Sequence, residues 1–212
     1  MKKAIIFDLD GTLWDSSETV ADSWNEVIAS FGGRELLTAD GMKKLMGKPM
    51  DEIAEIVFAG VDADRSMLME KCCEKEHEYV RRLGGRLYDN LEQQLAEMRA
   101  AGFELYIVSN CQLGYIDAFL DCYTSLRQYF DDTECWGNTG LQKDENIRLV
   151  MERRSVDRAV YVGDTQRDCD SAKGAGVPFI HAAYGFGEVE PGHAAAYSFE
   201  DILPLALKLT EE

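Results

Sequence analysis

Two carboxylates at the end of a short apolar run are the residues of this chain best suited to chemistry. The run Ala4–Phe7 stops at Asp8 and Asp10, and Gly11 follows. Four apolar residues are too few for a helix, so the run predicts a buried strand with both carboxylates at its carboxyl end. Ligands of open α/β sheets bind at that end. We therefore expect Asp8 and Asp10 to attack a ligand, transfer its protons or bind a metal.

Further polar residues follow later apolar runs or begin predicted helices: Ser109, Asn110, Lys143, Asp164 and Asp168. Parallel strands would bring these residues to the edge where Asp8 lies. Four carboxylates gathered there would repel one another by about 4 kcal/mol per close pair at an effective dielectric constant near 20. We therefore expect a cation, and an all-oxygen site of this kind suits Mg²⁺.

Together these residue types meet the needs of phosphoryl transfer to an aspartate. In this scheme Asp8 attacks phosphorus, and Asp10 protonates the leaving alcohol and then deprotonates the water that hydrolyses the aspartyl phosphate. Ser109, Asn110 and Lys143 would hold the phosphate oxygens. A calcium loop of the EF-hand type does not fit, because the glutamate required at its twelfth position is replaced by a threonine.

The elements that must position these residues alternate between helices and strands. An Asp15-x-x-Glu18 capping box predicts a helix that ends at Gly32-Gly33, and further helices are expected over about 39–46, 50–59 and 64–83, with Gly47-Lys48-Pro49 between the second and third. No strand pattern is visible between residues 15 and 85. Beyond them we expect helices at about 89–101, 116–126, 143–151, 168–175 and 199–209, and strands at about 103–108, 134–136, 159–162 and 177–182.

This alternation predicts an α/β fold, because parallel strands need crossover connections of helical length. We expect a Rossmann-like parallel sheet with helices on both faces, built from residues 1–14 and 86–212. Residues 15–85 would form an inserted all-helical domain, which we call the cap.

Composition and charge narrow the class of partner. The 22 basic and 39 acidic residues give a formal net charge of −17, which argues against a nucleic-acid polymer or an anionic membrane surface. No signal peptide or membrane span is recognisable, so we expect a cytoplasmic protein whose six cysteines are reduced. The sequence does not indicate the oligomeric state.

The chain resembles a known family. The segment Asp8-Leu9-Asp10-Gly11-Thr12-Leu13, the pair Ser109-Asn110, Lys143 and Gly163-Asp164-Thr165-x-x-Asp168 look like the four motifs of the haloacid dehalogenase superfamily, and the helical insertion resembles the cap of its phosphoglycolate phosphatase-like branch. One departure is Asp144, because the family usually has proline after the lysine.

The resemblance implies roles for individual residues. Asp8 would be nucleophile and metal ligand, Asp10 the acid and base whose backbone carbonyl also meets the metal, and Asp164 a further ligand. Asp168 would act through water or on Lys143, although it could also simply cap the helix that it begins.

Three alternative functions compete with that of a phosphatase. A dehalogenase of this family lacks the second acid, which Asp10 supplies here. A phosphomutase of the β-phosphoglucomutase type would carry a histidine and an arginine where this chain has Val20 and Met50. A non-catalytic binding protein on the same scaffold is the third. The substrate stays open among phosphoglycolate, sugar phosphates, nucleotides and pyrophosphate, and Lys48 in the cap is a candidate for selecting it.

Overall fold

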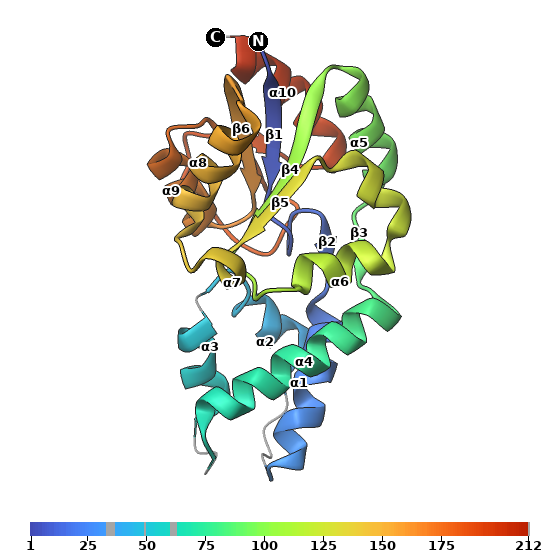
Figure 1. Cartoon of the computed structure of the whole chain (residues 1–212), viewed down its shortest axis with the longest axis vertical. Coiled ribbons are helices and arrows are strands. Elements are labelled where there is room, and N and C mark those ends of the chain that lie inside the picture. Colours follow the sequence, from blue (N-terminus) through green and yellow to red (C-terminus); the bar gives the residue numbers. More distant parts are fainter. Residues whose placement is uncertain (33–36, 49, 60–62, 212) are drawn as a thin grey trace.

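The computed structural model describes residues 1–32, 37–48, 50–59 and 63–211 (Figure 1). A parallel sheet with the strand order β5-β4-β1-β6-β7-β8 forms its centre. Its strands are β1 (Lys3–Phe7), β4 (Phe103–Ser109), β5 (Asp132–Cys135), β6 (Arg158–Gly163), β7 (Phe179–Ala182) and β8 (Ala194–Ala196). The α/β fold class expected from the sequence is confirmed.

Strand β1 lies inside the sheet and is buried on both faces. Ile5 and Phe7 belong to one hydrophobic cluster and Ile6 to a second, because successive side chains of a strand point to opposite faces. This double burial explains the continuous apolar run. Phe7 is level with Ile107 of β4 and Val162 of β6, so the residues that follow these three strands leave the sheet at the same edge.

Helices cover both faces of this sheet. The helices that follow the cap are α5 (Leu91–Ala100), α6 (Tyr115–Cys122), α7 (Trp136–Thr139), α8 (Lys143–Arg154), α9 (Gln166–Ala175) and α10 (Ile202–Glu211), with 3₁₀ turns at Thr124–Tyr129 and Phe199–Asp201. Helices α8 and α9 contribute to the cluster around Ile6, whereas α5 and α10 contribute to the cluster around Ile5 and Phe7. Among the described residues, no helix is both long and apolar enough to cross a membrane.

The cap helices form a lobe beyond the carboxyl edge of the sheet (Figure 1). They are α1 (Ser17–Ser30), α2 (Ala39–Lys43), α3 (Met50–Val57) and α4 (Arg65–Leu83). The chain enters and leaves this lobe through a short antiparallel ribbon of β2 (Trp14–Asp15) and β3 (Arg86–Leu87). This arrangement supports our proposal that residues 15–85 are a domain inserted into a core of residues 1–14 and 86–212.

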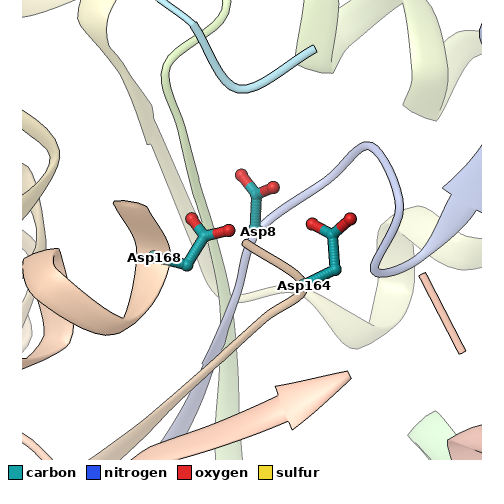
Figure 2. Close-up of side chains that lie close together, drawn as sticks. All are labelled: Asp8, Asp164 and Asp168. Carbon is teal, nitrogen blue, oxygen red and sulfur yellow. The ribbon is translucent and has the colours of Figure 1, made fainter. Parts of the chain in front are cut away.

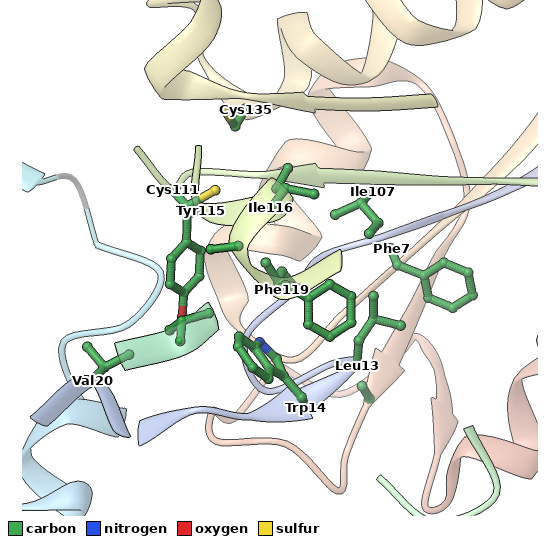
Figure 3. Close-up of a cluster of buried hydrophobic side chains, with 14 of the residues drawn as sticks. Phe7, Leu13, Trp14, Val20, Ile107, Cys111, Tyr115, Ile116, Phe119 and Cys135 are labelled. Atoms are coloured by element: carbon green, nitrogen blue, oxygen red, sulfur yellow. The ribbon is translucent and has the colours of Figure 1, made fainter. Parts of the chain in front are cut away.

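Trp14 fixes the junction between the ribbon and the core. Its side chain is fully buried, and its ring lies 4.8 Å from that of Phe119 and 6.2 Å from that of Tyr115, both on α6 (Figure 3). Aromatic pairs at these distances add stabilisation beyond the area that they bury. The point where the chain crosses into the cap is therefore anchored on the core.

Two expected helix starts are wrong. Helix α1 follows Ser16 rather than Asp15, because Asp15 still belongs to β2. Its carboxylate accepts hydrogen bonds from Ser17 and does not form the expected capping box with Glu18. Helix α5 follows Asn90, which has a positive φ of 58°, so the expected start at residue 89 comes too early.

Other boundaries also differ. The helix expected over 116–126 ends at Cys122 and continues as a 3₁₀ turn, and the strand expected at 134–136 lies at Asp132–Cys135. Strand β8 consists of three alanines, which carry no strand signal, so it was not predicted from the sequence. Gly33 and Pro49, which we expected at helix boundaries, lie outside the described residues.

Candidate active site

Three aspartates meet at the carboxyl edge of the sheet (Figure 2). Asp8 follows β1, Asp164 follows β6, and Asp168 lies in the first turn of α9. All three are buried, and one carboxylate oxygen from each lies within 4.8 Å of the others. The structure thus brings together three of the four carboxylates expected at one site.

Lys143 supplies the positive charge of this cluster. It is the first residue of α8, and its side chain is only 3% exposed. The Nζ group donates to Oδ1 of Asp8 at 2.9 Å and to Oδ1 of Asp168 at 2.6 Å. Burial acts against the ammonium, but the attraction of Asp168 and Asp8 outweighs it and raises the pKa of Lys143 well above the ordinary lysine range. The lysine is therefore charged at neutral pH.

Full ionisation of the three aspartates would leave this cluster with more negative charge than one ammonium balances. Burial raises the pKa of Asp8 and, with the negative charges of Asp168 and Asp8, raises that of Asp164 well above its ordinary value. Oδ1 of Asp164 is buried and has no hydrogen-bond partner among the described residues. Hard divalent cations take carboxylate oxygens as ligands. The buried oxygens and the unpaired Oδ1 therefore fit a divalent metal ion.

Glycines allow the backbone to close around Asp164. A Cβ atom at Gly11 or at Gly185 would collide with the Asp164 side chain, so both places exclude larger residues. Gly11 also has a positive φ of 81°, which favours glycine on conformational grounds. The backbone N–H of Phe186 donates to Oδ2 of Asp164 at 2.8 Å. This oxygen is held in place while Oδ1 stays available.

Asp10 is held by two hydroxyl groups. Ser16 Oγ donates to Oδ1 of Asp10 at 2.5 Å, and the phenol of Tyr115 donates to the same oxygen at 3.0 Å. Burial raises the pKa of Asp10, and the hydrogen bonds from the two hydroxyls oppose the rise. The raised pKa makes Asp10 easier to protonate than an ordinary aspartate, which suits a residue that must give and take a proton.

A small cavity of about 60 Å³ lies over these groups. Asp8, Asp10, Lys143, Ser109 and Asn110 line it from the core. Ser109 is the last residue of β4 and is buried. The candidate nucleophile, the acid and the expected phosphate-binding residues thus share one chamber.

Comparison with known proteins identifies the family. Residues 5–182 match the model of the haloacid dehalogenase-like hydrolases. The chain belongs to this family. The family and the enzyme class expected from the sequence, a phosphatase-type hydrolase, are thereby confirmed.

Individual relatives resemble the chain over most of its length. The phosphoglycolate phosphatase of Nitrosospira multiformis is 26% identical over 195 residues, which cover 88% of this chain and 85% of the relative. The tyrosine-protein kinase PtkA of Mycobacterium tuberculosis is 24% identical over 190 residues, which cover 88% of this chain but 64% of the kinase. The crystal structure of a predicted phosphoglycolate phosphatase from Haemophilus somnus superposes with a TM-score of 0.82 at 20% identity, covering 96% of this chain and 97% of that one.

The departure of this hydrolase from the usual lysine motif of the family does not displace the ammonium. Asp144 forms an ion pair with Arg148 at 2.9 Å, one turn further along α8. An acidic residue in the first turn also suits the helix dipole. Lys143 therefore keeps its place between Asp8 and Asp168.

Asp168 serves two partners with its two oxygens. Oδ2 accepts hydrogen bonds from N and Oγ1 of Thr165, at 3.0 and 2.6 Å, while Oδ1 accepts from Lys143. Asp168 thus both caps the helix and contacts Lys143, two of the roles that the sequence left open for it. The Thr165-x-x-Asp168 spacing carries the signal of a capping box, which the sequence analysis did not use.

The cap forms the opposite wall of the cavity. That wall combines five apolar side chains with a glycine and two charged residues: Val20, Trp24, Met42, Met46, Ile53, Gly47, Lys48 and Glu76. Lys48, the candidate specificity residue, thus faces the same chamber as Asp8. Lys43 is not among the lining residues, since it pairs with Asp15 at 3.0 Å. No sequence pattern predicted a place in this site for Ser16, Tyr115, Trp24 or Glu76.

Proposed function

We propose that this hydrolase is a Mg²⁺-dependent phosphatase of small phosphorylated metabolites that works through an aspartyl phosphate on Asp8. The observation that carries the proposal is the position of Asp8. Its buried carboxylate contacts Lys143, belongs to a cluster of three carboxylates, and shares a cavity with Asp10 and Ser109.

The proposed metal ligands are the carboxylates of Asp8 and Asp164 and the backbone carbonyl of Asp10. Asp168 would act on Lys143 rather than on the metal, since its oxygens are engaged by Lys143 and Thr165. A bound Mg²⁺ supplies positive charge that offsets the repulsion among the aspartates and between Asp8 and the phosphate.

In the first half-reaction a carboxylate oxygen of Asp8 forms a bond to phosphorus, and the bond from phosphorus to the leaving oxygen breaks. Asp10 gives its proton to that oxygen, so an alcohol departs. In the second half-reaction Asp10 takes a proton from water, whose oxygen attacks phosphorus. Phosphate leaves, and the carboxylate of Asp8 is restored.

Core residues would hold the phosphoryl group during both steps. Lys143 provides an ammonium beside Asp8, and Ser109 and Asn110 provide a hydroxyl and an amide at the end of β4. Donors fixed before the reaction stabilise charge that develops on the equatorial oxygens. The phosphoglycolate phosphatases that the chain resembles support phosphomonoesters as the substrate class. Within this class we keep phosphoglycolate, sugar phosphates and nucleotides as candidates.

A phosphomutase is less well supported. The place where the mutase pattern has a cap histidine holds Val20, which is buried and lines the cavity. An aliphatic side chain cannot donate or accept a proton. The cap wall at this point therefore suits a hydrolase better than a mutase.

The decisive experiment is hydrolysis of p-nitrophenyl phosphate with and without Mg²⁺. We expect that the wild type loses its activity in a chelator and regains it when Mg²⁺ is added back. Asp8→Asn should be inactive with or without the metal. The exposed residue Asp170 offers a matched control, and Asp170→Asn should keep its activity within two-fold of the wild type. Full activity in a chelator, or an active Asp8→Asn protein, would refute the mechanism.

A further inference from the structure

The cap wall of the cavity contains a buried carboxyl group that the proposed chemistry does not use. Glu76, on α4, is only 5% exposed and lines the same chamber as Asp8 and Asp10. Trp24 of α1 donates its Nε1–H to Oε2 of Glu76 at 2.7 Å. This bond links two cap helices and fixes one oxygen of the carboxyl group.

The second oxygen of Glu76 is available to a ligand. No hydrogen bond reaches Oε1 from the residues that the structure describes, whereas Oε2 has its indole partner. Gln112, another cavity residue, contains a buried Nε2 that likewise lacks a partner in the described part of the chain. An acceptor and a donor are thus both unsatisfied at the cavity wall. A hydroxyl group can donate to the first and accept from the second.

A second anionic group on the substrate fits this wall poorly. Asp8 and Asp10 already place two carboxylates on the core side, and Glu76 adds a third from the cap. Among the described cap residues that line the cavity, Lys48 is the one cation. Burial also raises the pKa of Glu76 to about 8, which shows how unfavourable a further negative charge is at this position. A hydroxyl adds no charge in either protonation state of the glutamate.

We propose that Glu76 determines specificity, and that the leaving group of the substrate carries a hydroxyl and no carboxylate, as in a short polyol or sugar phosphate. This inference rests on the proposed phosphatase function. The inference predicts that this protein and the phosphoglycolate phosphatases it resembles prefer different substrates, because phosphoglycolate would place its carboxylate against the cap wall.

The wild-type protein provides the first test. We would measure kcat/KM with Mg²⁺ for glycerol 3-phosphate, whose leaving group carries hydroxyls, and for phosphoglycolate, whose leaving group carries a carboxylate. p-Nitrophenyl phosphate serves as the reference for the core chemistry. The expected result is a preference for glycerol 3-phosphate over phosphoglycolate of at least ten-fold.

The second test changes the charge at one position. Glu76→Gln keeps the size of the side chain and an oxygen for the Trp24 indole, but its amide cannot become an anion. The wild type and the variant are therefore compared at pH 9, above the pKa of about 8 at which Glu76 ionises. The preference for glycerol 3-phosphate should fall at least ten-fold, mainly through faster hydrolysis of phosphoglycolate. Glu74→Gln, an exposed neighbour on the same helix, is the control and should keep the wild-type ratio. Circular dichroism would show whether both variants fold, and if Glu76→Gln does not, the wild-type ratio alone decides.

The outcomes separate the two proposals. A wild-type preference for phosphoglycolate, or an unchanged ratio in folded Glu76→Gln, would overturn this inference while hydrolysis of p-nitrophenyl phosphate still supports the phosphatase. Absence of hydrolysis of all three compounds with Mg²⁺ would overturn the proposed function and this inference with it.

Discussion

The phenol of Tyr115 donates a hydrogen bond to the carboxylate of Asp10 at 3.0 Å, although 105 residues separate the two in the chain. Tyr115 is buried at the start of α6, and its hydroxyl also lies 3.1 Å from Oγ of Ser16. Ser16 in turn donates to Asp10. The two hydroxyls therefore fix the orientation of the proposed acid and base from two separate elements.

We predict that Tyr115→Phe lowers kcat for p-nitrophenyl phosphate about ten-fold and changes KM little. The variant keeps the ring that packs on Trp14 but loses a hydrogen bond to a carboxylate, a bond of a kind that contributes about 1.5–3 kcal/mol. Steady-state kinetics would measure both constants. Tyr106→Phe is the control, because the Tyr106 hydroxyl donates to Glu104, which does not line the cavity. An unchanged kcat in Tyr115→Phe would show that Ser16 alone holds Asp10.

A second prediction compares Lys143 of the active site with Lys173, an exposed lysine of α9. Lys143 is buried between Asp8 and Asp168, whereas Lys173 is exposed on α9. Lys143→Met should reduce hydrolysis at least 1,000-fold and lower the free energy of unfolding by about 3 kcal/mol, because it leaves buried carboxylates without their cation.

Urea unfolding without Mg²⁺ and hydrolysis of p-nitrophenyl phosphate would measure the two effects. Lys173→Met removes an exposed lysine and should change the unfolding free energy by no more than about 0.5 kcal/mol. Equal effects of the two substitutions would contradict the assignment of Lys143.

The positions of Asp8, Ser109 and Asp164 could be predicted because each ends or directly follows an apolar strand. Strand patterning is local, and a parallel sheet brings the carboxyl ends of its strands to one edge. Once the chain alternates between strands and helices, these side chains must lie along that edge. The strand order places β1 between β4 and β6, so the residues that end these three strands are neighbours along the edge of the sheet.

Contacts between elements that no local pattern connects could not be predicted. The bond from Trp24 to Glu76 joins two helices across 52 residues, and it depends on how α1 packs against α4. Hydrophobic periodicity predicts which face of a helix is buried, but not which polar atoms meet inside the interface. The ribbon of β2 and β3 could not be predicted for another reason, since strands of two residues are too short to show alternation.

A third prediction tests the cap residue that the sequence analysis selected. Lys48 lines the cavity beside Gly47, and a Cβ atom at Gly47 would lie 3.6 Å from Cγ2 of Thr165, so this turn lies close to the core. Lys48→Ala should lower kcat/KM for the best substrate of a phosphometabolite panel at least ten-fold, and lower it less for p-nitrophenyl phosphate, which lacks a natural leaving group.

The exposed neighbour Lys44 is the control for charge, and Lys44→Ala should change neither value by more than two-fold. Equal losses on both substrates in Lys48→Ala would remove Lys48 from the specificity site and leave a general role in binding.

The last prediction uses the buried carboxyl group of Glu76 as a probe of pH. Burial raises its pKa from an ordinary 4.5 to about 8; the hydrogen bond from the Trp24 indole opposes the rise, and the negative charge of Asp10 adds to it. Between these pH values the folded protein keeps a proton that the unfolded chain has released. Raising the pH through this window therefore favours unfolding, so this contribution to stability is complete below about pH 4.5 and is lost by about pH 8.

Thermal unfolding of the wild type and of Glu76→Gln at pH 5.5 and pH 8, without Mg²⁺, would measure this contribution. Asp8, Asp10 and Asp164 also have raised pKa values, but they are present in both proteins, so the difference between the two isolates Glu76. The melting temperature of the wild type should fall on the order of 5 °C more than that of Glu76→Gln over this range. Parallel falls in the two proteins would mean that Glu76 is ionised in the folded state at neutral pH, with water or a cation reaching it through the cavity.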